Sequence, residues 1–149
     1  MQENDTEAVK SLAGVWRLLS SEFRGSSGDV MYPLGEDASG QVIFTESGYM
    51  SAQLMRQGRP VFAAGDQASG TDQEIKAAFQ GYVAYYGSCK IDVKEKTLTT
   101  DVVGSLYPNW VGGRQLRYYE LTDQTLLLKT PPLAFGEEEI TGVLTWERV

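Results

Sequence analysis

The chain contains 149 residues, 42% of them hydrophobic, and carries a formal net charge of −7, which suits one domain with one core. It contains no histidine and a single cysteine, Cys89, which excludes Ser-His-Asp and Cys-His catalysis, histidine-ligated metals and an internal disulfide. We therefore predict no metal and no other cofactor, and we interpret Cys89 as a small buried residue. Because the 13 basic residues are scattered through an acidic chain, we expect no nucleic-acid partner.

The first residues are polar and acidic, and we predict an N-terminal tail (residues 1–11) in front of one domain (residues 12–149). This segment lacks the basic start and the apolar run of a signal peptide. No window of the chain approaches the roughly 20 apolar residues of a membrane span. These features predict a cytoplasmic protein that does not associate with a membrane.

Alternating apolar residues predict about eight to nine short strands, at residues 12–24, 30–32, 40–45, 49–56, 82–93, 97–106, 112–121, 125–130 and 140–148. The clearest pair is the central hairpin, whose turn contains Glu46, Ser47 and Gly48. Both faces of this hairpin are partly apolar, which is typical of a closed or doubly covered sheet with a lined interior.

The segment 57–70 is rich in glycine, alanine and proline, and we interpret it as a flap over an opening. Thr71 and Glu74 after it have the spacing of a capping box, in which each side chain bonds the backbone N–H of the other residue. They predict one short helix that ends near Gly81.

Short strands at meander spacing with one inserted helix favour an antiparallel sheet, because a parallel sheet would need a helix between most strands. The predicted fold class is therefore all-β, an antiparallel barrel of about eight to nine strands with one short helix. A barrel of roughly eight strands is just wide enough to hold one small ligand.

Four long segments follow one another in the chain: YPLGEDASGQVIFTESGYMSAQLMR, FQGYVAYYGSCKID, SLYPNWVGGRQLRYYEL and LTWERV. They resemble the lipocalin-like domain family of bacteria and fungi, from about Leu12 to Val149. The resemblance implies a calycin-type barrel with a small-molecule cavity, but not one activity, since related proteins include cyclases and isomerases as well as binders. Gly14-Val15-Trp16 also resembles the Gly-x-Trp signature of true lipocalins, which implies that Trp16 closes the barrel base against a late arginine, Arg148.

Polar side chains alternate with apolar ones on two of the predicted strands. They are Ser51 and Gln53 on the central hairpin, and Gln115, Arg117 and Tyr119 on a later strand. We predict that they point into the barrel, where a few polar groups among hydrophobic ones would recognise the carbonyl, phenol or carboxylate of a largely apolar ligand. Gln53 and Arg117 are expected to share one cavity. The alternative for Arg117 is exposure to solvent or an ion pair with an acid such as Glu120.

The connection at 107–110 is unusually aromatic for a turn, and we interpret it either as the rim of the cavity or as a hydrophobic plug at a barrel end. The tyrosines of the strand at 82–93 either offer a phenol as a general acid or pack in the sheet. The predicted ligand-binding residues are Tyr32, Ser51, Gln53, Tyr86, Tyr107, Trp110, Gln115, Arg117 and Tyr119.

These observations support three hypotheses for the function. The first is a barrel that binds a small, mainly apolar molecule, oxygenated or aromatic, in its interior. The second is an isomerase, cyclase or lyase that uses the same cavity without a metal or cofactor. The third is a structural module that forms a homodimer through the aromatic connection or an open sheet edge.

Overall fold

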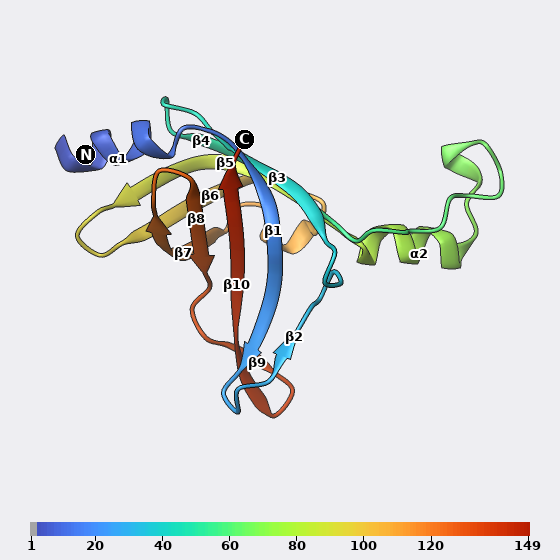
Figure 1. Cartoon of the computed structure of the whole chain (residues 1–149). Helices are drawn as coiled ribbons and strands as arrows, with labels where there is room; N and C mark the ends of the chain where they lie inside the picture. Colours follow the sequence, from blue (N-terminus) through green and yellow to red (C-terminus); the bar gives the residue numbers. More distant parts are fainter. Residues whose placement is uncertain (1–2) are drawn as a thin grey trace.

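The computed structural model describes the backbone of residues 3–149 and the side chains of residues 5–134 and 136–149. In this part of the chain, ten strands form one antiparallel sheet, and four helical segments accompany it (Figure 1). The strands are β1 (Gly14–Gly25), β2 (Val30–Met31), β3 (Ser39–Phe44), β4 (Tyr49–Met55), β5 (Tyr82–Asp92), β6 (Thr97–Ser105), β7 (Arg114–Leu121), β8 (Thr125–Lys129), β9 (Leu133–Phe135) and β10 (Glu138–Arg148). The helices are α1 (Glu3–Leu12) and α2 (Asp72–Gln80), with the 3-10 turns η1 (Gln67–Ser69) and η2 (Pro108–Trp110).

The sheet closes into a barrel because β1 pairs with β3 on one side and with β10 on the other. Without β2 and β9, eight of the ten strands form the ring. β2 and β9 pair with the ends of β1 and β10, which run side by side to the lower end of the molecule (Figure 1). The predicted all-β antiparallel barrel is thus confirmed, and β9 is a strand that the sequence pattern did not predict.

The predicted central hairpin is formed by β3 and β4, with Phe44 opposite Met50 at its turn. Gly48 has a φ of 89°, a conformation that glycine adopts without steric cost. Val42 and Phe44 are buried in the core, as is Ala52 of β4, so the hairpin contributes one full face to the barrel interior.

One end of the barrel is closed by Trp16, which is fully buried. The guanidinium of Arg148 lies 4.2 Å from the centre of its ring, so the pairing that the resemblance implied is confirmed. Arg148 also donates to the carbonyl oxygens of Ser11, Ala13 and Asp123, at 2.6, 3.1 and 3.0 Å. This one side chain therefore connects the barrel base to the end of α1, to the residue after that helix and to the turn between β7 and β8.

The predicted polar tail is wrong over most of its length, because residues 3–12 form the helix α1. Val9 and Leu12 are 8% and 4% exposed and belong to the hydrophobic core, and Trp16 donates its Nε1–H to the Leu12 carbonyl at 2.9 Å. Asp5 accepts a hydrogen bond from the backbone N–H of Val93 at 3.0 Å. The helix is stabilised by these tertiary contacts, which a short helix in water lacks.

The predicted capping box of α2 is confirmed, since Thr71 and Glu74 accept each other's backbone N–H groups. The backbone N–H of Thr71, together with that of Ala63, lowers the pKa of the Glu74 carboxyl. No residue of α2 is buried, and Figure 1 shows the helix projecting from the barrel. We call residues 57–80 the arm. No helix among the described residues is long and apolar enough to cross a membrane.

Candidate binding cavity

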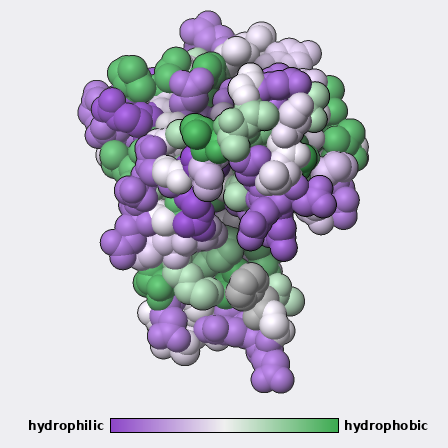
Figure 2. All heavy atoms as spheres, turned by 90° about the vertical axis from the view of Figure 1, so that its right-hand side faces the viewer, coloured by the Kyte–Doolittle hydropathy of each residue, from purple (hydrophilic) through white to green (hydrophobic). Residues whose placement is uncertain are grey.

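A cavity of about 310 Å³ lies inside the barrel. This volume is at the lower end of the range of roughly 300 to 1,000 Å³ for small-molecule sites. Its wall is mainly apolar and includes Leu34, Val42, Leu54, Val83, Leu128 and Trp146. Leu133 of β9 also lines it, so the cavity extends toward the end of the barrel where β2 and β9 lie. On the face from which α2 projects, apolar residues gather in the lower part, near that end (Figure 2).

β7 places Arg117 in the wall of this cavity. Its Nη1 donates to the Leu116 carbonyl at 2.9 Å, and its Nη2 donates to Oε1 of Gln115 at 3.1 Å. Its Nε is buried and has no hydrogen-bond partner among the described residues. The ion pairs between described side chains do not include Arg117. Two neutral acceptors of its own strand therefore orient the guanidinium, and its Nε–H is buried without a partner among the described residues.

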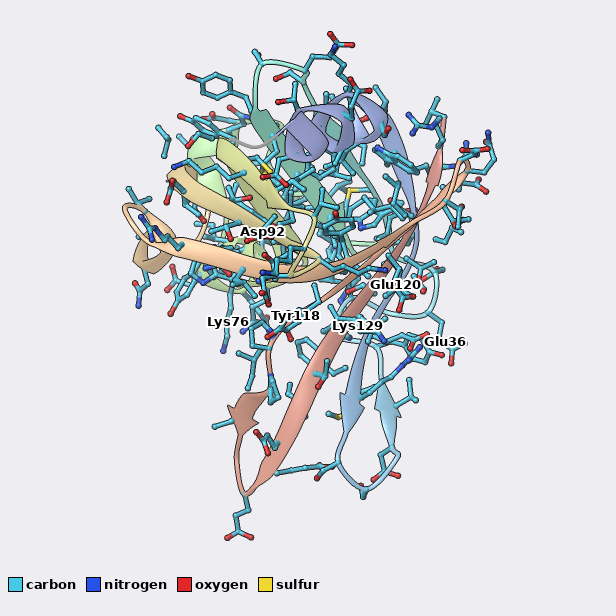
Figure 3. All side chains as sticks on the ribbon, turned by 90° about the vertical axis from the view of Figure 1, so that its left-hand side faces the viewer. Glu36, Lys76, Asp92, Tyr118, Glu120 and Lys129 are labelled. Carbon is cyan, nitrogen blue, oxygen red and sulfur yellow. The ribbon has the colours of Figure 1, made fainter. Side chains whose placement is uncertain are left out.

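Alternation along β7 puts Tyr118 and Glu120 on the outer face of the barrel, where both are exposed. Figure 3 labels them together with Lys129 of the neighbouring strand β8. Because Arg117 lies on the opposite face of β7, the ion pair with Glu120 does not form among the described side chains. The outer face of the strand therefore carries Arg114 and Glu120, and the inner face carries Arg117.

Three aromatic side chains contribute polar or flat surfaces to the cavity. Tyr85 of β5 is 9% exposed, and its ring meets that of Trp110 edge to face at 5.4 Å. Burial raises the pKa of the Tyr85 phenol, an effect that the neighbouring Arg117 guanidinium opposes. The phenol is therefore neutral at physiological pH. Trp146 of β10 is 1% exposed, and its Nε1 has no hydrogen-bond partner among the described residues.

A second pocket of about 240 Å³ adjoins the first, and we call it the vestibule. It is lined by Phe79, Tyr82, Ala84, Ser105, Leu106 and Tyr107, and it shares Gln80, Val83 and Trp110 with the interior cavity. Tyr107 packs edge to face against Trp110, with ring centroids 5.7 Å apart. Trp110 therefore lies between the interior and a half-exposed outer pocket beside the end of α2.

The family sequence model that describes the lipocalin-like domain matches residues 13–149 of this chain. The chain belongs to the lipocalin-like domain family. It is 35% identical over 107 residues to the 4'-hydroxy-3'-methoxypropiophenone carrier protein ppsC of Aspergillus oryzae. That match covers 67% of this chain and 96% of the relative. One relative of this lipocalin-like domain is thus named as the carrier of a small aromatic ketone.

Three residues predicted to line the interior of this lipocalin-like domain lie on the outer face of the barrel instead. Ser51 and Gln53 are exposed, because Met50, Ala52 and Leu54 of β4 point inward. Gln53 accepts a hydrogen bond from the hydroxyl of Tyr82, so the prediction that it shares a cavity with Arg117 is wrong. Tyr86 is 53% exposed, because Tyr85 takes the inward position on β5.

The other predicted residues lie at different depths. Trp110 and Arg117 line the interior, Tyr107 lines the vestibule, and Gln115 contacts the cavity only through Arg117. Tyr32 is 37% exposed in the segment after β2. Tyr119 packs against the core near α1. Burial is the main cause that raises the pKa of its phenol, and the charges of Asp5 and Asp92 add to this effect. The structure therefore brings together two of the nine predicted residues in the interior wall.

Tyr85 and Trp146 are interior residues that the sequence-based set omitted. The signal for Tyr85 was its position in the alternating series with Val83, Gly87 and Cys89, the less polar face of β5. Trp146 lies two residues before Arg148 on β10, within the LTWERV segment. Among the described residues, no cluster of three or more metal-ligating side chains is present.

Proposed function

We propose that this lipocalin-like domain binds one small, mainly apolar and oxygenated molecule in its interior cavity. The observation that carries the proposal is a cavity of about 310 Å³ with an apolar wall and two buried N–H groups, on Arg117 and Trp146, without partners among the described residues. Buried donors are costly when unpaired, so a ligand oxygen at these atoms would stabilise the complex.

The named relative supports an aromatic ligand for this chain as well. A hydroxy-methoxy aryl ketone combines one flat apolar ring with carbonyl, phenol and ether oxygens. The aromatic rings of Tyr85, Trp110 and Trp146 supply flat surfaces for such a ring. We propose that the chain carries a molecule of this class.

The first experiment is mass spectrometry of small molecules extracted from natively purified protein, followed by calorimetric titration with 4'-hydroxy-3'-methoxypropiophenone. Ala52→Phe tests the cavity by adding a ring to its interior wall. Ser51→Phe is the matched control, because it adds the same ring at the adjacent position on the outer face of the barrel. Overpacking costs about 1 to 3 kcal/mol of stability, so both variants are checked by urea unfolding.

We expect Ala52→Phe to weaken binding at least tenfold and Ser51→Phe to leave the affinity unchanged. Equal effects of the two variants would place the ligand outside the barrel. If no molecule copurifies and no titration saturates, the binding function itself is refuted.

A further inference from the structure

Arg117 forms no ion pair with a carboxylate among the described residues. The lining includes one carboxylate, Glu22, whose Oε2 accepts from Nε of Arg24 at 2.9 Å. Tyr85 does not supply a negative charge, since its pKa is raised by burial. A guanidinium removed from bulk water is destabilising unless acceptors or an opposite charge meet it. Arg117 therefore lies in the lining without an ion pair to a described carboxylate.

Several residues of the lining carry hydrogen-bond donors. Arg117 and Trp146 each offer a buried N–H without a partner among the described residues. Thr130 already uses its Oγ1 to accept the backbone N–H of Gly142 at 2.8 Å, which leaves its hydroxyl hydrogen to donate. The oxygens of Gln115 and Leu116 already accept from Arg117, and the Tyr85 hydroxyl also interacts with its guanidinium. A negatively charged ligand oxygen would add the charged acceptor that none of these groups gives Arg117.

We infer that the cavity holds its ligand as an anion, an aromatic molecule whose carboxylate or phenolate oxygen accepts hydrogen bonds from Arg117. This inference rests on the proposed function and names the chemical class of the ligand at that site. The anion neutralises the guanidinium, accepts from its N–H groups and leaves the aromatic ring against the apolar wall. A charge-assisted hydrogen bond in a partly dry site is stronger than one between neutral groups.

Two pairs of probes test this inference by calorimetric titration at neutral pH. One pair is 4'-hydroxy-3'-methoxypropiophenone and its 4'-methyl ether, and the other is 4-methoxybenzoate and 4-methoxybenzamide. In at least one pair, we expect the acidic member to bind about tenfold to hundredfold more tightly than its neutral partner. When the phenol is the preferred probe, its absorption should shift to the longer-wavelength band of the phenolate on binding, at a pH where the free phenol is mostly protonated.

Arg117→Met keeps a similar apolar volume without the charge, and Arg114→Met is the matched control. Arg114 lies on the same strand but on the outer face, where its Nε donates to Asp101 at 2.9 Å, and its side chain is 77% exposed. Both variants lose one positive charge, but only Arg117 lines the cavity. We therefore expect the preference for the acidic probe to disappear in Arg117→Met and to persist in Arg114→Met. The titration of neutral probes should change little in either variant.

Equal binding of acidic and neutral probes to the wild type would overturn the inference and leave the proposed function intact. The same holds if Arg117→Met and Arg114→Met keep the same preference. If none of the four probes binds and nothing copurifies, the proposed function and the inference fail together. If Arg117→Met does not fold, the comparison of probes and the ligand spectrum in the wild type still decide the question, and Arg117→Gln provides a second neutral variant.

Discussion

Replacing Arg148 with methionine should destabilise the barrel by removing the side chain that connects three segments at its closed end. The arginine donates to carbonyl oxygens before β1 and after β7, and its guanidinium lies 4.2 Å from the Trp16 ring centre. Methionine keeps the apolar stem of the side chain and removes its charge and its donors. The loss therefore measures the polar part of this connection.

The magnitude follows from the surroundings of each contact. The hydrogen bonds to Ser11 and Asp123 are exposed, so water replaces them at little cost. The partly buried bond to Ala13 is worth about 1.5 kcal/mol as a charged hydrogen bond. The cation over the buried Trp16 ring adds about 1 kcal/mol. We expect a loss of about 2 to 3 kcal/mol, equivalent to about 4 to 12 °C in Tm for a chain of this size.

The assay is urea unfolding followed by tryptophan fluorescence and far-UV circular dichroism. Arg17→Met is the matched control, since Arg17 forms an exposed ion pair with Glu147 on the neighbouring strand, and such pairs contribute little. Its change should stay within about 0.5 kcal/mol. If Arg148→Met and Arg17→Met lose the same stability, the closed end does not depend on Arg148 and the reasoning is refuted.

Two further predictions follow from local features. Burial raises the pKa of the Cys89 thiol from its ordinary 9.0 to about 12, so the unfolded chain releases this proton first as the pH rises. The free energy of unfolding should therefore fall more steeply between pH 9 and 12 in the wild type than in Cys89→Ala, and parallel pH curves from urea unfolding would contradict this. Thr71→Ala removes the N-cap of α2 and should weaken that helix by about 1 kcal/mol. Because no residue of α2 is buried, amide exchange should accelerate severalfold in α2 and not in the barrel strands, whereas a loss of global stability would show that the arm is part of the core.

The features that the sequence predicted well depend on short-range patterns. The β3–β4 hairpin follows from its turn glycine, and the start of α2 follows from the Thr71 and Glu74 pair. The contact of Trp16 with Arg148 was implied by the family resemblance instead. Arg117 followed from the alternation along β7, whose outer positions are more polar. In each case, the residues themselves distinguish the two possible arrangements.

The errors occur where two arrangements have similar sequence patterns. On β4, both faces are partly apolar, and choosing the wrong one turns every side chain of the strand to the other side. On β5, a shift in the pairing with β6 after Tyr86 accompanies the choice between two adjacent tyrosines. Helix α1 is stabilised by the packing of Val9 and Leu12 on the barrel, which a polar composition does not predict.

The arm leaves the barrel and returns to it at the same place. The backbone N–H of Arg56 donates to the Gly81 carbonyl at 2.8 Å, directly beyond the pair formed by Met55 and Tyr82 at the ends of β4 and β5. The arm is therefore an excursion within one hairpin, and a tight turn could join the two strands in its place. Loop-closure entropy changes slowly with length, by about 0.6 kcal/mol per doubling. This connection is thus the position at which the chain should accept a circular permutation or an inserted domain while the barrel keeps its strand order.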